Sequence, residues 1–184
     1  MSRIKLVNQE NMPSEQKAEY DRFPSNLFRG LLRTKNSTHG YAELGAALRD
    51  TYLSAKDREF VIIRVACMSN SAYELMQHTH LAMQQGLRAK DIDAIAQNDL
   101  QYFDQRMAMI LRFINECVSQ VKVSTDTFEA IRKYLGEGEI AELTLLIGHY
   151  MMTARFLETL EIDLDETPTS WDNVYLFLRR RIGN

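Results

Sequence analysis

The amino-acid sequence predicts an all-α protein, and three observations carry that prediction. The 184-residue chain has only eight glycines and three prolines. The prolines are Pro13, Pro24 and Pro168, so nothing between the last two forbids long helices. We find no clear period-2 alternation bounded by hairpin turns, the pattern that would indicate strands. The chain is long enough to bury a core, and we expect one helical domain.

Local signals place the helices of the N-terminal third. Pro13 stands where a short helix would begin, and Pro24 ends it. Ser25 then opens a second short helix over residues 27–33. A third helix, weakened by two internal glycines, is expected over residues 38–52.

Residues 54–86 predict a buried helical hairpin. Ser54 is a good N-cap, and Asp57 three residues later forms a variant of the capping box. The helix over 56–68 is apolar on nearly every side, so it should lie at the centre of the fold. A three-residue break follows, and a second helix runs over 72–85.

Apolar positions at helical spacing indicate the remaining helices. The expected ranges are 90–96, 101–121, 124–135, 140–160 and 171–182. The fourth of these is apolar almost all round, and the last is amphipathic and ends in three arginines.

Composition and charge exclude several classes of protein. The formal net charge is −3, which argues against binding to nucleic acid or to an anionic membrane. No window approaches the apolar length of a membrane span, and the N-terminus lacks a signal-peptide core, so we expect a cytoplasmic protein. Cys67 and Cys117 are fifty residues apart and fit a reducing compartment, in which both would act as small buried hydrophobes.

The hairpin carries the candidate site. Glu74 and His78 are four residues apart and share one helix face, and Ser71, seven residues before His78, lies on that face too. If the two helices are antiparallel, Glu59 on the first lies level with His78 on the second, because both are about 12–15 Å from the turn. Two carboxylates and an imidazole would then share one apolar cleft.

Such a cluster shifts the pKa values of its members, which is how general acids and bases are made. The plainer alternative is a surface Glu–His pair that contributes little. A metal site made by Glu59, Glu74 and His78 has suitable ligand types but no recognised spacing, and we disfavour it. His80 points about 200° away from His78 and belongs to another face.

Three further residues have open roles. Tyr73 lies about 140° from His78, but it sits in the first helical turn, near the mouth of the hairpin, where it can still reach the site. His149 and Tyr150 lie in the apolar helix over 140–160. A hydrogen-bonded core pair is slightly favoured for them over a site role.

The hairpin also shows an ordered series of motifs. They are Arg-Glu before an aliphatic run at 58–63, Asn-Ser-Ala-Tyr-Glu at 70–74, His78, and Gly-Leu at 86–87. With the apolar run over 142–157, these resemble the carboxymuconolactone decarboxylase family, which includes the alkylhydroperoxidase D-like proteins.

The resemblance covers about residues 53–164. It implies an all-helical homo-oligomer, often a trimer or hexamer, with an active-site cleft beside the hairpin and near a subunit interface. We expect a single domain with its core over 40–165, an N-terminal helical extension over 1–39 and a C-terminal helix over 166–184. We expect a small-molecule substrate, and no cofactor and no metal.

In the peroxidase branch of the family, the site resembles a relay of Glu, Cys-x-x-Cys and His. Glu59 matches the upstream Glu and His78 the relay His, whereas Ser71 and Glu74 stand at the two cysteine positions. A dithiol peroxidase needs a low-pKa thiolate and a resolving thiol. The missing pair therefore makes peroxidase activity the disfavoured alternative.

The decarboxylase branch implies acid/base catalysis on a small carboxylated lactone. On that resemblance, His78 is the acid/base and Glu59 orients it. Glu74 and Tyr73 contact the substrate or shuttle protons, and Ser71 joins the substrate-binding residues.

A carboxylated substrate also requires a cation, and Arg58 and Arg64 are near in sequence. A second alternative is a non-catalytic oligomeric binding protein, in which the Glu/His cluster only satisfies buried polar groups.

Overall fold

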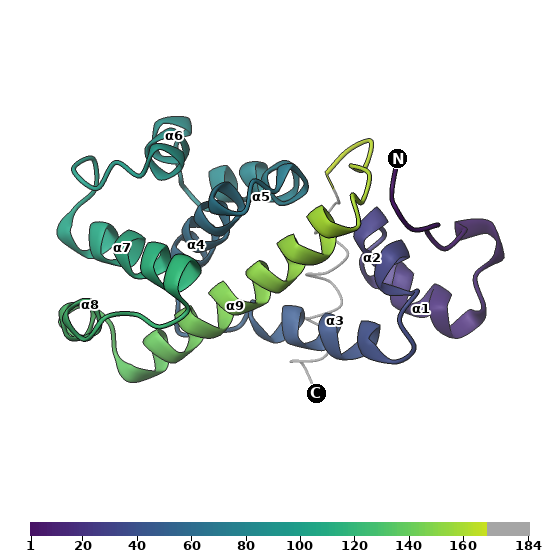
Figure 1. Cartoon of the computed structure of the whole chain (residues 1–184), viewed down its shortest axis with the longest axis horizontal. Helices are drawn as coiled ribbons and strands as arrows, with labels where there is room; N and C mark the ends of the chain where they lie inside the picture. The colour runs from purple at the N-terminus through teal and green to yellow at the C-terminus, as the bar shows by residue number, and fades with distance from the viewer. Residues whose placement is uncertain (169–184) are drawn as a thin grey trace. The chain divides into compact units, whose positions relative to one another are not determined.

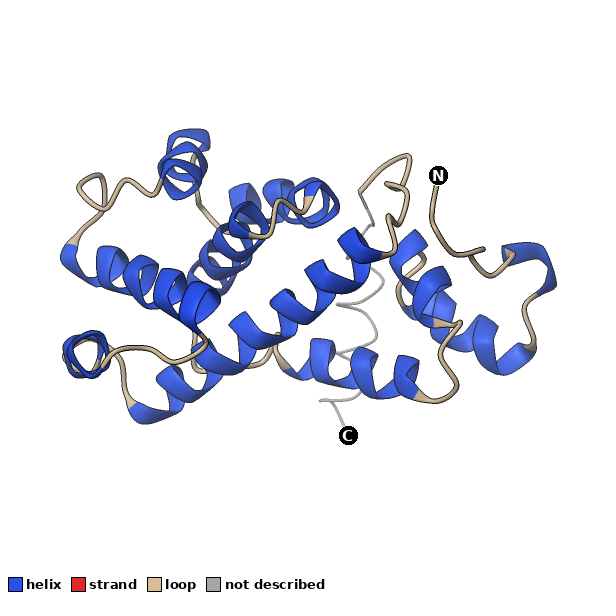
Figure 2. Cartoon of the chain, viewed as in Figure 1, coloured by secondary structure: helices blue, strands red, loops and turns tan. Residues whose placement is uncertain are grey.

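The computed structural model describes residues 1–168, and within them it contains nine α-helices, one short 3-10 turn and no strand (Figures 1 and 2). The all-α prediction is therefore confirmed. The amphipathic helix predicted over 171–182 lies outside the described residues.

The observed helices follow the predicted order. Their bounds are α1 Ser14–Arg22, α2 Asn26–Leu31, α3 Ser37–Ala47, α4 Ala55–Met68, α5 Ala72–Gln84, α6 Ala89–Gln97, α7 Gln105–Gln120, α8 Thr125–Ile131 and α9 Glu137–Thr159. The 3-10 turn η1 is Gln9–Asn11.

The observed bounds differ most from the predicted ones at the end of α3, at the start of α7 and at the end of α8, which stops at Ile131 and not at residue 135. Helix α3 ends at Ala47 and not at residue 52, because the amide of Tyr52 donates to the carboxylate of Glu142 at 2.6 Å and holds the segment before α4 as a turn. Helix α7 begins at Gln105 and not at 101, because the Asp104 carboxylate accepts the Met107 amide at 2.8 Å and caps the helix there.

The chain divides into two compact units. The first comprises Met1–Ala47 and the described residues from Leu157 onward, and the second comprises Leu48–Phe156. Within the first, α2 packs against α1 and α3. Within the second, α4 packs against α5, α6 and α7. The single domain with a core over 40–165 stays a prediction.

Helix α4 forms the centre of the second unit, as its apolar sequence predicts. Its residues 60–63 are at most 1% exposed. Ser54 caps the helix by accepting the amide of Asp57 at 3.0 Å. The capping-box prediction is wrong in its second half, because both carboxylate oxygens of Asp57 accept from Arg106 on α7, at 3.0 and 2.8 Å. Asp57 thus ties α4 to α7.

A tight turn reverses the chain between α4 and α5, which Figure 1 shows side by side. Asn70 has a φ of 51°, a left-handed conformation that Asn tolerates better than most residues. The amide of Ser71 donates to the carbonyl of Ala66 at 2.9 Å. The predicted antiparallel hairpin is therefore present, and its geometry sets the register of the site.

Candidate functional site

The hairpin brings Glu59 of α4 and His78 of α5 into direct contact. Nδ1 of His78 lies 2.9 Å from Oε2 of Glu59. Both residues are 3% exposed, so the pair is shielded from water. Their juxtaposition across 19 residues of sequence is the one that the antiparallel arrangement predicts.

Glu74 completes a three-membered cluster, which we call the relay (Glu59, His78 and Glu74). Nε2 of His78 lies 3.6 Å from Oε2 of Glu74, one helical turn earlier on α5. Glu74 is only 4% exposed. The imidazole therefore sits between two carboxylates, with one ring nitrogen directed to each.

The charges around the relay determine that Nδ1 of His78 carries a hydrogen. Burial alone would raise the pKa of Glu59, but the charge and hydrogen bond of His78 and the charges of Arg49 and Arg58 outweigh it, so the pKa is lowered. An ionised Glu59 requires that Nδ1 of His78 carries a hydrogen and donates it. Nε2 is then the nitrogen whose protonation can change, and it faces Glu74.

Helix α9 places two aromatic rings next to the relay, from the two residues whose role the sequence left open. The Tyr150 ring packs edge-on against the His78 ring, with centroids 5.1 Å apart. The His149 ring packs edge-on against Tyr150, with centroids 5.3 Å apart. The rings of His78, Tyr150 and His149 thus form a continuous series from α5 to α9.

His149 is a buried neutral histidine. Burial, followed by the positive charges of His78 and Arg49, lowers its pKa from 6.5 to about 4. Because the folded-state pKa lies below the unfolded one, the unfolded chain takes up the proton first as the pH falls. The contribution of neutral His149 to the free energy of unfolding is therefore fully present above pH 6.5. It decreases between pH 6.5 and pH 4, and it does not change further below pH 4.

We expect proton uptake by His149 in the unfolded chain to lower the free energy of unfolding by about 3 kcal/mol between pH 7 and pH 4. Urea denaturation of the wild type and of His149→Gln at pH 7, 6, 5 and 4 measures the effect. The variant should lose less stability than the wild type over that interval. His39→Gln, which removes an exposed imidazole, is the matched control and should retain the loss. Equal pH dependence in the wild type and in His149→Gln would contradict the assignment.

The sequence analysis did not single out Arg49, a cation whose charge acts on the relay. Arg49 lies in the turn before α4 and lowers the pKa of both Glu59 and His149 through its charge. Its carbonyl accepts from Nη1 of Arg58 at 3.0 Å, which anchors the turn. Arg64 points elsewhere, because its Nη1 donates to the carbonyls of Ile95 and Ala96 at the end of α6.

The two predicted substrate-binding residues lie close to the relay in the chain. Ser71 is fully buried and caps α5, since its Oγ accepts the amide of Glu74 at 3.5 Å. Tyr73 is 3% exposed in the first turn of the same helix. Contact of either residue with a substrate stays a prediction.

Both cysteines are free thiols outside the relay. Cys67 at the end of α4 is half-buried and Cys117 on α7 is buried. Burial raises the pKa of each thiol, against a smaller opposing effect of Arg64 on Cys67. Neither is therefore an activated thiolate. Within residues 1–168, no three His, Cys, Asp or Glu side chains are arranged as metal ligands.

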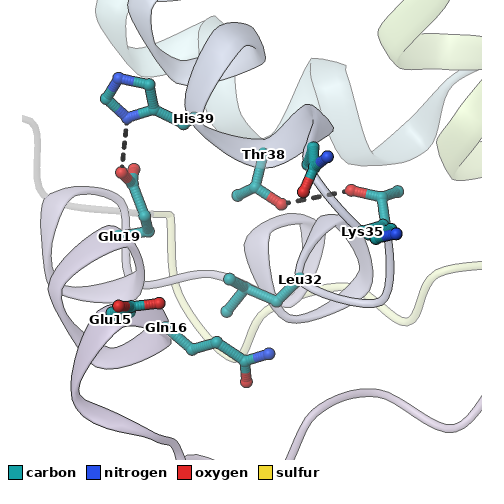
Figure 3. A pocket seen from close by; sticks show the side chains of 9 residues that line it. Glu15, Gln16, Glu19, Leu32, Lys35, Thr38 and His39 are labelled. Carbon is teal, nitrogen blue, oxygen red and sulfur yellow. Dashed lines mark hydrogen bonds and ion pairs between the residues drawn. The ribbon is translucent and has the colours of Figure 1, made fainter.

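Two surface hollows of about 240 Å³ each lie away from the relay residues. One, in the first unit, is lined largely by polar side chains, among them Glu19 and His39, whose ion pair of 2.7 Å is drawn in Figure 3. The other, in the second unit, combines Lys56 and Arg88 with the apolar Phe103 and Met107. Glu59, Glu74 and His78 line neither hollow.

The chain is similar to known proteins in part of its sequence and in its fold. Residues 37–116, which include the whole relay, match the model of the carboxymuconolactone decarboxylase family. No helix described in residues 1–168 is long and apolar enough to cross a membrane. No significant match was found among curated proteins.

Solved structures with the same fold cover nearly the whole chain. A peroxidase-related protein with an alkylhydroperoxidase AhpD core from Ralstonia eutropha JMP134 is 16% identical, with a TM-score of 0.78 over 90% of this chain and 93% of that one. A peroxidase-related protein from Silicibacter sp. TM1040 is 14% identical, with a TM-score of 0.77 over 90% and 92%. The debrominase Bmp8, as a cysteine-to-alanine variant with 2,3,4-tribromopyrrole, is 9% identical, with a TM-score of 0.73 over 98% and 99%.

The fold is that of the alkylhydroperoxidase AhpD-like structures. Residues 37–116 are thus similar to the carboxymuconolactone decarboxylase family. Identities this low show the fold and leave the chemistry to be argued from the relay.

Proposed function

We propose that the protein is an acid/base lyase that decarboxylates a small carboxylated lactone. One observation carries the proposal: a buried imidazole is held between two carboxylates, with one nitrogen fixed by Glu59 and the other directed to Glu74. This arrangement suits reversible proton transfer at Nε2 of His78. The match of residues 37–116 to the carboxymuconolactone decarboxylase family supports a substrate of the lactone type.

The proposed step balances without a cofactor. The bond between the ring carbon and the carboxylate breaks, CO₂ leaves, and the electron pair enters the conjugated lactone carbonyl. Nε2–H of His78 then donates a proton to the carbon that lost CO₂, and Nε2 regains a proton from water through Glu74. Ionised Glu59 stabilises the imidazolium form, as a carboxylate does for a general-base histidine.

Charge favours an anionic substrate at this position. Arg49 brings a positive charge close to Glu59 and to neutral His149, so a substrate carboxylate or a developing enolate would be stabilised there. We propose that Tyr73 and Ser71 line the substrate side of the relay. The substrate must displace side chains to reach Nε2, because His78 is 3% exposed.

Thiol peroxidase chemistry has less support. On the family resemblance, Ser71 and Glu74 stand where the peroxidase branch has its two cysteines. Burial raises the pKa of both Cys67 and Cys117. We also propose a cytoplasmic location, because two free thiols suit a reducing compartment.

The test compares two reactions in one preparation. We expect CO₂ release from unsaturated γ-lactone carboxylates and no hydroperoxide consumption above background, with the Cys67→Ser/Cys117→Ser protein behaving like the wild type. Lactone loss is followed by ultraviolet absorbance and peroxide loss by a coupled assay. Peroxide turnover that survives in the double variant, without lactone turnover, would overturn the proposal. Substrate binding without turnover of either kind would favour a binding protein.

A further inference from the structure

The surface hollow of the second unit combines apolar side chains with two cations. Leu87, Phe103 and Met107 form the apolar part of its lining, and Lys56 and Arg88 supply the positive charges. Its volume is about 240 Å³. An apolar cavity of about 150 Å³ is large enough to hold benzene, so this hollow has room for a ligand built on a single ring.

Two neighbouring aromatic rings hold Phe103 in place. Its ring packs edge-on against Phe60, with centroids 5.2 Å apart, and edge-on against Tyr102, with centroids 5.0 Å apart. Phe60 is 0% exposed in the core of α4. Phe103 therefore offers a fixed aromatic surface on the wall of the hollow, and such a surface packs well against another aromatic ring.

A buried carboxylate fixes the orientation of Arg88. Nε and Nη2 of Arg88 donate to the two carboxylate oxygens of Asp91 at 3.1 and 2.7 Å, and Tyr102 donates its hydroxyl to the same carboxylate at 2.8 Å. Asp91 is 6% exposed, but the hydrogen bonds from the Arg88 side chain outweigh its burial and hold the pKa of Asp91 well below its ordinary value. The carboxylate of Asp91 is therefore ionised and already paired. Nη1 of Arg88, in contrast, donates to no other residue in the part of the chain that the structure describes.

Lys56 supplies a second cation, with which no described carboxylate pairs. It is exposed in the first turn of α4, and its ammonium makes no hydrogen bond or ion pair with any other residue of 1–168. The other carboxylate in the lining belongs to Asp104, whose Oδ1 accepts the amide of Met107 at 2.8 Å and caps α7. The hydrogen-bond donors left free in the hollow are thus cationic, and they outnumber the free carboxylate oxygens.

We propose that this hollow binds a small aromatic carboxylate. The ring of the ligand packs against Phe103 and Met107, and its carboxylate accepts from Nζ of Lys56 and from Nη1 of Arg88. No residue of the relay lines the hollow. It is therefore a ligand site in addition to the proposed lyase site.

The lining favours this class of ligand over two others. Inorganic phosphate would engage only the cations and leave the apolar side chains in water, and an aromatic amine would place its positive charge beside Lys56 and Arg88. The hollow of the first unit has the same volume, but Leu32 is the one apolar side chain among the described residues that line it, and His39 there is paired with Glu19. Only the hollow of the second unit thus joins an aromatic wall to free cations.

The experiment titrates the full-length protein into 4-fluorobenzoate and follows the probe by fluorine NMR. We expect a Kd of about 1 mM, which is in the range for a ligand of this size. The probe 4-fluorobenzylamine has the same ring and the opposite charge, and it should bind at least about tenfold more weakly. Equimolar inorganic phosphate should leave most of the 4-fluorobenzoate bound.

Charge variants locate the bound carboxylate. Lys56→Gln should weaken binding of 4-fluorobenzoate about fivefold, because it removes an exposed cation. Lys35→Gln is the matched control and should leave the Kd unchanged, since Lys35 is an exposed lysine that lines the hollow of the first unit. Asp104→Asn should strengthen binding about twofold, because asparagine retains the cap of α7 and removes the negative charge. Circular dichroism confirms that each variant is folded.

The relay variant His78→Gln separates this site from the lyase site, and it should bind the probe like the wild type. Binding that is lost in His78→Gln and kept in Lys56→Gln would place the carboxylate at the relay and overturn the proposal. No binding of 4-fluorobenzoate, equal or tighter binding of the amine, or displacement of the probe by phosphate would overturn it as well. Failure of the lactone assay leaves all of these expectations in place, so the two proposals fail independently.

Discussion

His78→Gln is expected to lower the decarboxylation rate by about 10² to 10⁴-fold, because it removes the only imidazole held between the two carboxylates. Glutamine retains a polar side chain near Glu59 but cannot carry a proton to and from carbon. The loss should appear in kcat, since proton delivery belongs to the transition state. Steady-state kinetics on the lactone substrate measure the effect.

His80→Gln is the matched control for that change. It removes an imidazole from the same helix two residues away, where Nδ1 of the ring is buried and has no hydrogen-bond partner among the described residues. It should leave kcat within about twofold of the wild type. Unaltered kcat in a folded His78→Gln protein would show that the relay is not catalytic and that the buried cluster is structural.

The hairpin part of the site could be predicted from the sequence because its determinants are local. A capped helix, a short break and a second helix fix an antiparallel register, and that register sets Glu59 against His78. The four-residue spacing of Glu74 and His78 likewise decides a contact of 3.6 Å without reference to the rest of the chain. Helical periodicity was sufficient for these three residues.

The contributions from outside the hairpin could not be predicted in the same way. Tyr150 reaches His78 from α9, 72 residues along the chain, and helical periodicity on α9 does not say which helix its faces meet. Arg49 was hidden because the helix predicted over 38–52 placed it inside a regular element and not in a turn. Arg64 was named as a nearby cation, but the carbonyls at the end of α6 take its guanidinium, a long-range partner with no sequence signal.

Glu59→Leu is expected to destabilise the protein by about 3–5 kcal/mol at pH 7, because it leaves a buried imidazole without its carboxylate. Glu59→Gln keeps an oxygen that accepts from Nδ1 of His78, so it should cost less than half as much. Urea denaturation at fixed protein concentration gives both values. Glu129→Leu is the control, because Glu129 forms an exposed pair with Arg132 and should change stability by less than about 1 kcal/mol.

The pH dependence separates a lost charge pair from simple overpacking by leucine. The folded-state pKa of Glu59 is lowered from its ordinary value of 4.5, so its contribution is complete above that value and is lost as the pH falls below it. The difference between wild type and Glu59→Leu should therefore narrow below pH 4.5. A difference that is the same at pH 7 and pH 3.5 would assign the loss to packing alone, and would remove the ionised carboxylate that the proposed mechanism requires beside His78.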